Sequence, residues 1–153
     1  MQLFICDSML GSLARLMRMV GIDTEYWRSH DRRALAEKAA RESRVVLTRI
    51  RRIPRNLQQQ CTWYTVTSET LQDQMNEVVR YFSIQSDTFR PLARCLRCNK
   101  ELVYVSKAEV AGHIPEYVYN NMNEFSMCLR CKRIYWKGTH YNNMLKLIKV
   151  DLK

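Results

Sequence analysis

Four cysteines in the second half of the chain have the residue type and spacing of a metal site. They form two C-x-x-C motifs, at residues 95–98 and 128–131. Four thiolates from two such motifs can surround one tetrahedral Zn²⁺ at zinc–sulfur distances of about 2.3 Å. The alternatives are disulfides and a thioredoxin-like redox pair, but a disulfide between such close cysteines is strained, and neither motif opens an obvious βαβ unit. We predict one structural zinc ion, with no open position for catalysis, held by Cys95, Cys98, Cys128 and Cys131.

Cations and aromatic rings are interleaved directly after the second motif, in residues 132–141. Cations attract phosphates and flat rings stack on unpaired bases, so this composition is typical of a single-stranded nucleic-acid surface. In a strand, Tyr135 and Trp136 would point to opposite faces, so we expect one in the core and the other exposed. His140 could cap a helix, contact phosphate or serve as a spare ligand. The predicted RNA contacts here are Lys132, Arg133, Trp136 and Lys137.

Positive charge is concentrated in two blocks of the chain. The 153 residues carry 25 Lys+Arg against 15 Asp+Glu, a formal charge of +10. Residues 28–55 hold ten basic and three acidic residues, and residues 91–153 hold eleven basic and five acidic ones. This distribution favours a polyanionic partner, most simply nucleic acid, with an ordinary charged solvent face as the alternative.

Composition excludes several other classes of protein. Apolar residues make up 46% of the chain, which excludes a disordered tail, and the length suffices to bury a core without covalent staples. No apolar run approaches the roughly 20 residues of a membrane span, and Asp7 and Arg15 interrupt the first apolar stretch, against a signal peptide. We therefore expect a soluble, intracellular protein without a membrane partner.

The elements that position these residues alternate between strand and helix. Apolar and β-branched runs predict strands at 3–6, 23–27, 44–48 and 62–67, and helical spacing predicts helices from Ser8 to Gly21, at 33–42 and from about Thr70 to Phe82. Residues 49–60 are predicted to be a loop or a broken helix. Such alternation indicates a parallel sheet covered on both faces, with Asp7 and Arg49 at the carboxyl ends of strands, where ligands gather. Cys6 and Cys61 lie in apolar contexts and are predicted to pack in the core.

Composition also divides the chain into two units. We predict an α/β domain at 1–83, a linker at 84–94, and a zinc-ribbon subdomain at 95–153 with an inserted helix and a C-terminal helix. The 29 residues between the cysteine motifs exceed those of a minimal ribbon. Within them, Ser106 and Glu109 have the spacing of a capping box for a short helix.

Short motifs over nearly the whole chain resemble one known family. Those of the first half are Asp7-Ser8-Met9-Leu10-Gly11, Leu13-Ala14-Arg15, Gly21-Ile22-Asp23-Thr24 and Val46-Leu47-Thr48-Arg49. Those of the second half are Arg94 to Asn99, Val105-Ser106-Lys107, Ile114-Pro115, Tyr117-Val118-Tyr119, Glu124-Phe125 and Tyr135 to Tyr141. Their order and spacing resemble the Mut-seven C-terminal family. The resemblance implies an α/β fold, in which a PIN-like parallel sheet flanked by helices is followed by a four-cysteine zinc-ribbon subdomain.

Members of this family occur alone in microbes and as C-terminal parts of animal 3′-to-5′ exoribonucleases of RNA silencing. The basic charge resembles the animal kind, so Met1 is expected to lie within a longer polypeptide. The implied partners are single-stranded RNA, an exoribonuclease domain in cis and a protein of a silencing complex. The implied location is the cytoplasm, including perinuclear RNA granules.

The acids of a PIN-type nuclease are incomplete in this chain. Such cleavage needs several carboxylates that hold divalent metals at the carboxyl ends of parallel strands. The family pattern places them after the first strand, before the second helix and after a Thr-Arg pair that follows the third strand. Asp7 and Asp31 match the first two positions, but Ile50 occupies the third. Isoleucine cannot ligate Mg²⁺, and nearby arginines repel cations and attract phosphates, so neither Mg²⁺ nor Mn²⁺ is expected. The predicted phosphate contacts here are Arg32, Arg33, Arg49, Arg51, Arg52 and Arg55.

We therefore predict an RNA-binding module with a degenerate PIN-like nuclease site. It would have no catalytic residues, only the vestigial Asp7 and Asp31, and would present single-stranded RNA to an exoribonuclease domain of a longer chain in RNA silencing. One alternative is a residual metal-dependent ribonuclease that uses Asp7 and Asp31, with Glu69 as a further acid. Another is a protein-interaction scaffold, in which apolar residues of the linker and of 117–125 dock a partner.

Overall fold

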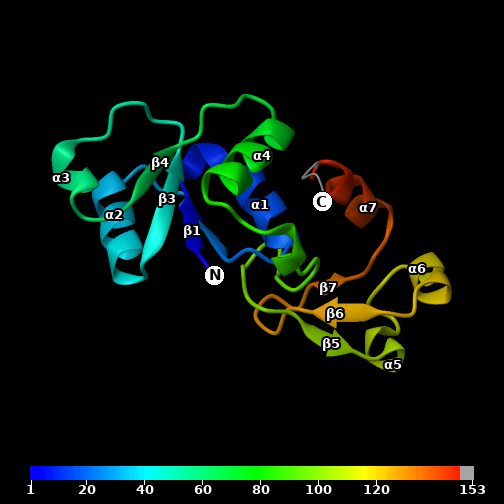
Figure 1. The fold of residues 1–153 in the computed structure, drawn as a ribbon. Coiled ribbons are helices and arrows are strands. Elements are labelled where there is room, and N and C mark those ends of the chain that lie inside the picture. The colour runs from blue at the N-terminus through cyan, green and yellow to red at the C-terminus, as the bar shows by residue number, and fades with distance from the viewer. Residues whose placement is uncertain (149–153) are drawn as a thin grey trace.

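Four parallel strands form the central sheet of the first half of the chain (Figure 1). The computed structural model describes residues 1–148, and the strand order of this sheet is β2-β1-β3-β4. The strands are β1 (Leu3–Cys6), β2 (Thr24–Tyr26), β3 (Arg44–Thr48) and β4 (Trp63–Thr65). Both central strands, β1 and β3, are nearly continuous buried runs, as expected for strands that are covered on both faces. The predicted parallel sheet is confirmed.

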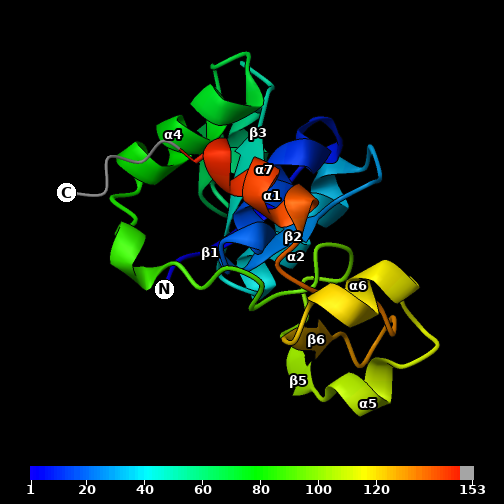
Figure 2. The ribbon, with the colours of Figure 1, turned by 90° about the vertical axis from the view of Figure 1, so that its right-hand side faces the viewer.

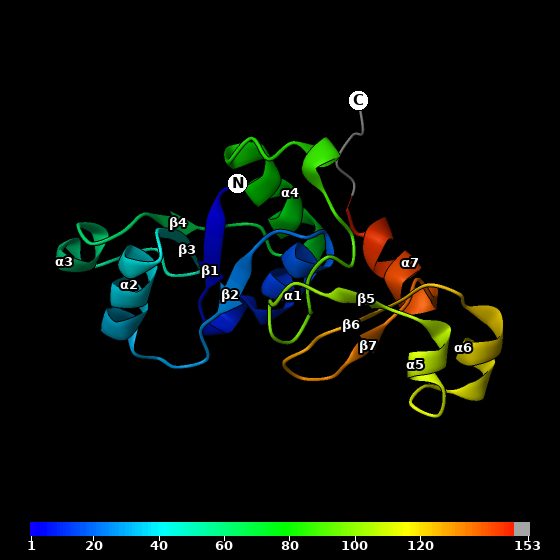
Figure 3. The same cartoon turned by 90° about the horizontal axis from the view of Figure 1, so that it is seen from below.

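Helices cover both faces of this sheet, as Figure 3 shows. They are α1 (Gly11–Met19), α2 (Arg32–Arg41), the single turn α3 (Arg55–Gln58) and α4 (Leu71–Tyr81). α1 and α4 pack against the face that carries Phe4, and α2 packs Leu35 against the face that carries Ile5. Neighbouring strand residues point to opposite faces, so Phe4 and Ile5 belong to different apolar clusters. Cys6 lies in the first cluster and Cys61 packs against the second, as predicted.

The first helix begins later than its apolar spacing predicts. Ser8 was expected to cap it, but residues Ser8–Leu10 form a separate 3-10 turn, and α1 starts at Gly11. The cap of that turn is Asp7, whose carboxylate accepts a hydrogen bond from the Met9 amide at 3.0 Å. Within 49–60, the predicted loop or broken helix contains the single turn α3.

Helices α1 and α4 end in the same way. Gly21, the predicted helix stop, follows α1 with φ +89°, and Ser83 follows α4 with φ 51°. Beyond α4, the Ser83 amide donates to the Arg80 carbonyl and the Ile84 amide to the Val79 carbonyl, and α1 closes with the equivalent pair of bonds. These bonds satisfy carbonyls that the helix itself leaves free.

Residues 84–94, the predicted linker, run along the end of α1. The Arg90 amide donates to the Val20 carbonyl at 2.8 Å, and the Leu92 amide donates to the Met19 carbonyl at 3.0 Å. The Leu92 side chain also packs against the apolar cluster that contains Phe4, Leu13 and Met75, called the main apolar cluster below. This segment is therefore bonded to the sheet domain along its length.

The second half of the chain forms a small antiparallel sheet, with strand order β5-β6-β7. Its strands are β5 (Val103–Val105), β6 (Phe125–Met127) and β7 (Ile134–Tyr135), and its helices α5 (Lys107–Val110) and α6 (Glu116–Asn121) lie between β5 and β6. Ser106 and Glu109 form the predicted capping box at the start of α5. Val105, Val110 and Phe125 make a separate small core, called the ribbon core below.

The last described helix returns to the first half. Met144 of α7 (Thr139–Lys146) is buried in the main apolar cluster, and Figure 2 shows this helix beside α1. No helix within residues 1–148 is long and apolar enough to cross a membrane. Residues 149–153 of the predicted zinc-ribbon subdomain lie outside the described residues.

Candidate metal centre and nucleic-acid interface

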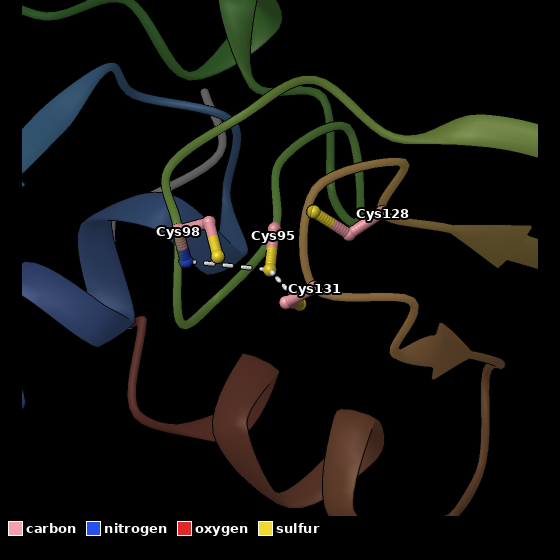
Figure 4. Close-up of side chains that lie close together, drawn as sticks. All are labelled: Cys95, Cys98, Cys128 and Cys131. Atoms are coloured by element: carbon pink, nitrogen blue, oxygen red, sulfur yellow. Dashed lines mark hydrogen bonds between the residues drawn. The ribbon is translucent and has the colours of Figure 1, made fainter.

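The four cysteines of the C-x-x-C motifs meet between two loops. Their sulfur atoms all lie within 4.8 Å of one another. Figure 4 shows Cys95 and Cys98 on one loop, facing Cys128 and Cys131 on the loop that joins β6 to β7. Among residues 1–148 this is the one group of three or more His, Cys, Asp or Glu side chains placed to share a metal ion.

The two cysteine loops have the same backbone geometry. In the first, the Cys95 amide donates to the Lys100 carbonyl at 2.8 Å, and the Asn99 amide donates to the Cys95 carbonyl at 2.9 Å. The second loop repeats both bonds around Cys128, at 2.9 and 2.8 Å. Asn99 and Lys132 occupy the same left-handed position, with φ of 61° and 63°. Each loop therefore turns both of its sulfurs toward the shared centre.

The chemistry of the four sulfurs fits a divalent ion. Burial and the neighbouring sulfurs raise the pKa of Cys98 to about 12, and burial raises the pKa of Cys128. At Cys95, burial is outweighed by hydrogen bonds from the Tyr135 hydroxyl and nearby amides, which lower the pKa to about 7. A soft divalent cation would relieve the repulsion between crowded thiolates. Four protein ligands leave it no open position, so such an ion would tie the two loops together.

Asp7 lies at the carboxyl edge of the sheet, where the strand order changes direction. The chain places β2 on one side of β1 and β3 on the other, and open α/β sheets bind ligands at such a point. The Met9 amide donates to one oxygen of the Asp7 carboxylate at 3.0 Å, and the Thr48 hydroxyl donates to the other. Both oxygens are therefore engaged by the protein, and Asp7 is only 7% exposed.

A cavity of about 120 Å³ opens beside Asp7. Arg32, His30 and Ile50 line it together with Asp7. Asp31 is not among its lining residues, because its carboxylate accepts a hydrogen bond from the Ala34 amide at 3.0 Å and caps α2. The structure thus brings Ile50 to the cavity beside Asp7, as the family pattern implied, and among the described residues Asp7 is the one acid that lines it, together with Arg32.

The six arginines predicted to contact phosphate have different surroundings. Arg49 donates to the carbonyls of Val66, at 3.3 Å, and of Ser68, so it holds the loop after β4. Arg33 pairs with Glu37 at 3.4 Å on the exposed surface of α2. The remaining arginines of this set are exposed, and within the described part of the chain none of them has a carboxylate partner: Arg32, Arg51, Arg52 and Arg55.

The predicted contacts after the second cysteine motif divide in a similar way. Three cations are exposed: Lys132, Arg133 and Lys137. The expectation that one of Tyr135 and Trp136 would be exposed is wrong, because both are half-buried. Tyr135 ends β7, and its hydroxyl accepts a hydrogen bond from the Leu96 amide at 3.2 Å. Trp136 follows the strand, so strand alternation does not govern it, and it packs against the ribbon core.

Sequence reasoning missed a set of arginines that meet between the two halves of the molecule. Two come from the first half, on α1 and after β2, and two come from the cysteine loops: Arg15, Arg28, Arg97 and Arg130. No sequence pattern around Arg15 or Arg28 predicts that these side chains lie beside the cysteine loops. The repeated Leu-Arg within both C-x-x-C motifs was a usable signal, because it places one arginine at the same point of each loop.

Comparison with known proteins gives one result. A family model described as Mut7-C RNAse domain matches residues 2–148, which includes both halves of the molecule. No curated protein and no solved structure matches the chain.

Proposed function

Because the chain belongs to the Mut7-C RNAse domain family, we propose that it binds single-stranded RNA with a nuclease-like fold whose own catalytic site is degenerate. The family description links the fold to RNA, and the formal charge of +10 supports a polyanionic partner. We propose that RNA phosphates contact the exposed segment after β3, which carries Arg51, Arg52 and Arg55.

The surroundings of Asp7 carry this proposal. Metal-dependent hydrolysis of a phosphodiester needs several carboxylates that together hold Mg²⁺ or Mn²⁺. At the carboxyl edge of the sheet, Asp7 is the one described acid that lines the cavity, where Arg32 and Ile50 also lie, and its carboxylate already accepts hydrogen bonds from Met9 and Thr48. A guanidinium repels the cation that hydrolysis requires and attracts phosphate. These surroundings support anion binding better than metal catalysis.

In this proposal the ion at the four cysteines is Zn²⁺, and its role is structural. Zinc favours four thiolates in a closed tetrahedral site, which supplies folding energy and leaves no position for substrate. Mass spectrometry of the native protein and metal analysis test this assignment, with one zinc per chain expected. Another metal, or none, would contradict it.

The finer role that we propose is delivery of RNA to an exoribonuclease domain in cis, in a longer polypeptide of RNA silencing. The support is the family to which the chain belongs and its basic charge, which resembles that of the animal members. Copurification of the full-length polypeptide with small RNAs of a silencing complex is the expected result, and its absence would contradict this role.

Fluorescence anisotropy with a labelled single-stranded RNA tests the binding function. We expect the wild-type chain to bind at physiological salt, and the triple variant Arg51→Glu, Arg52→Glu, Arg55→Glu to lose about tenfold in affinity with a flatter salt dependence. The control variant carries the same charge change at exposed positions elsewhere, Arg41→Glu, Arg80→Glu and Lys146→Glu. Equal losses in the two variants would contradict the assignment to this loop, and no binding by the wild type would contradict the function.

Metal-dependent cleavage is the second candidate, because the family description is that of an RNAse and Asp7 lies where such a fold binds ligands. Incubation of labelled RNA with the protein and Mn²⁺ or Mg²⁺ tests it. The informative variant is Asp7→Asn, because asparagine keeps an oxygen that can accept the Met9 amide. Cleavage that this variant abolishes would replace the binding proposal, and no cleavage by the wild type would exclude the second candidate.

A further inference from the structure

Arginines from both halves of the molecule line one continuous cleft. Its larger part, of about 570 Å³, is lined by Arg15, Arg28, Arg97 and Arg133. An adjoining part of about 510 Å³ shares Arg28 and Arg97 with it and adds Arg130. Arg28, the first residue of the first basic block, therefore lies here with Arg97, Arg130 and Arg133 of the second block, beside Arg15 and Arg18 of α1. Both volumes are in the range of ligand sites, about 300–1,000 Å³.

The guanidinium groups of this cleft are available to a ligand. The five arginines other than Arg18 are exposed, and within residues 1–148 none of them pairs with a carboxylate or donates a side-chain hydrogen bond. Arg28 lies over the ring of Tyr26, 5.8 Å from its centroid, which holds the side chain at the cleft wall. Gly11 and Ser12, in the first turn of α1, also line the cleft, and the positive end of this nine-residue helix adds to the attraction for anions.

A buried arginine fixes the floor of the cleft. Arg18 is only 5% exposed, and its guanidinium donates to the Thr24 carbonyl at 2.7 Å, the Leu96 carbonyl at 2.9 Å and the Arg97 carbonyl at 3.1 Å. These bonds join α1, the start of β2 and the first cysteine loop. Because Leu96 and Arg97 belong to that loop, the backbone from which the Arg97 side chain enters the cleft is held against α1.

An apolar cavity of about 350 Å³ lies next to the arginine cleft. The two share Arg15 and Leu96, and the apolar cavity is walled by the aromatic rings of Tyr135, Trp136 and Tyr141. The Trp136 indole N–H has no hydrogen-bond partner among the described residues. The ring lies close over Gly138, where a Cβ atom would come within 2.8 Å of Nε1, so the glycine makes room for it.

From this arrangement we propose that the junction binds one unpaired nucleotide of an RNA strand, with its phosphate in the arginine cleft and its base in the aromatic cavity. The proposal rests on the RNA-binding function and names its ligand as single-stranded. Arginines suit phosphate because their planar groups donate two hydrogen bonds at once. Aromatic walls suit a base that has left its stack, and this is possible in a single strand without the cost of breaking a pair.

The cleft arginines carry more positive charge than is needed to neutralise a zinc ion with four thiolates. A zinc ion with four thiolates would carry two formal negative charges, and Glu25 adds one more at the cleft wall. Arg18 and the five exposed arginines outnumber these charges. The cleft therefore keeps a net positive charge for an external anion.

The phosphate half of the site is tested with the double variant Arg15→Glu, Arg28→Glu. Its control is Arg41→Glu, Arg80→Glu, which changes the charge equally at exposed positions that line none of these cavities. By anisotropy with a labelled single-stranded RNA, we expect a loss of about tenfold beyond that of the control. Zinc content and circular dichroism establish that both variants fold. If the wild type binds RNA and the two variants lose equally, this inference is wrong while the binding function stands.

The base half of the site is tested by tryptophan fluorescence, because stacking on a base quenches an indole. We expect single-stranded RNA to quench the wild type and a duplex of the same sequence to leave it unchanged. Trp63→Phe should keep the quench, since Trp63 packs against the α2 side of the sheet, and Trp136→Phe should lose it. Gly138→Ala, which displaces the indole without a change of charge, should weaken binding of the single strand. Equal quenching in Trp136→Phe, or equal affinity for the duplex, would overturn the assignment of the base.

Discussion

At Asp7 and Glu77, amides and hydroxyls of the protein donate hydrogen bonds to a carboxylate near the edge of the sheet. The Met9 amide and the Thr48 hydroxyl engage the two oxygens of Asp7. Glu77 accepts hydrogen bonds from the amides of Thr67 and Ser68 at 2.9 and 2.8 Å, so it holds the loop between β4 and α4. Both acids lie near the carboxyl edge of the sheet, and both stabilise a turn there.

Replacement of Asp7 should lower the free energy of unfolding, and the loss should be larger when fewer side-chain oxygens remain to accept the bonds from Met9 and Thr48. In Asp7→Ala the Met9 amide and the Thr48 hydroxyl both lose their partner, so we expect the free energy of unfolding to fall by about 2 kcal/mol. In Asp7→Asn the remaining oxygen keeps the bond from Met9, and the loss should be about half as large. Urea denaturation measures both. Equal losses would mean that the negative charge, and not the hydrogen bonds, provides the stability.

Glu77 should make folding stability depend on pH in the acid range. Burial alone would raise the pKa of Glu77, but hydrogen bonds from Ser68, Thr67 and Tyr64 outweigh burial and lower the pKa to about 2. Because this pKa lies below that of the unfolded chain, the ionised group stabilises the fold at neutral pH. The contribution is lost as the pH falls from about 4.5 to about 2. Glu77→Gln should be less stable at pH 7, and its stability should change less over this range, as measured by urea denaturation at several pH values. Parallel pH profiles for the two proteins would contradict the assignment.

Among the elements, the helix ends show how a local conformation can depend on one residue type. Gly21 and Ser83 occupy the same left-handed position after α1 and α4. Glycine adopts this conformation without strain, whereas a side chain costs roughly 1 kcal/mol there. At Gly21 the neighbourhood adds a second constraint, because a Cβ atom would lie 2.7 Å from the Arg90 carbonyl oxygen.

Opposite substitutions at these two ends should therefore have opposite effects. Ser83→Gly should raise the free energy of unfolding by about 1 kcal/mol, because it relieves the backbone of α4 at its last turn. Gly21→Ala should lower it by more than about 2 kcal/mol, since it adds both strain and a collision with residues 84–94. Thermal and urea unfolding measure both. A loss of stability in Ser83→Gly would show that the serine side chain contributes more than the backbone strain costs.

The elements also show which parts of the fold are predictable from the sequence. The bounds of β1 and β3, the helix stop at Gly21 and the capping box of Ser106 and Glu109 follow from local patterns, and the structure agrees with all of them. The end of α4 also agrees with the predicted bound at Phe82, but the left-handed conformation of Ser83 could not be predicted, because serine is more typical of helix starts. The half-buried position of Trp136 depends on where β7 ends, and a two-residue strand has too little pattern to fix that point.

The candidate sites divide in the same way. The spacing of the four cysteines predicts their site. Asp7 and Ile50 follow the ends of two adjacent strands, and this position brings them to the same cavity. The engagement of Asp7 by Thr48 depends on side-chain geometry, which no pattern reveals, whereas the position of Asp31 directly before a run of helix formers is a usable signal for its capping role. The arginine cleft depends on how the two halves meet, so only its cysteine-loop members had a sequence signal.

In the whole molecule, the metal centre and the sheet domain are bonded to each other through the first cysteine loop. Arg18 holds Leu96 and Arg97 from α1, and the Tyr135 hydroxyl lies 3.2 Å from the Cys95 sulfur while its ring packs against the main cluster. Asn99 continues this junction, because its side chain accepts the Thr24 amide at 3.0 Å. Disturbance of the cysteine loops should therefore reach the sheet.

Removal of the metal should destabilise the chain as one unit. After treatment with a chelator we expect a single unfolding transition, shifted down by at least about 10 °C, because the loops anchored by Arg18 lose their cross-link. Calorimetry measures the shift, and addition of Zn²⁺ should reverse it. Two separate transitions, with that of the sheet domain unchanged, would mean that the halves fold independently.

The bonds of Arg18 to Thr24, Leu96 and Arg97 hold the first cysteine loop and β2 against α1, so this wall of the arginine cleft is formed before any ligand arrives. A site that is already formed has little of its own freedom to lose on binding, so more of the contact energy is expressed as affinity. In the proposed complex, the entropic cost of ordering would then fall on the RNA. Discrimination among RNAs would follow from how readily each strand adopts the shape of the cleft, and flexible sequences that unstack easily would be preferred over stiff ones, whatever their bases.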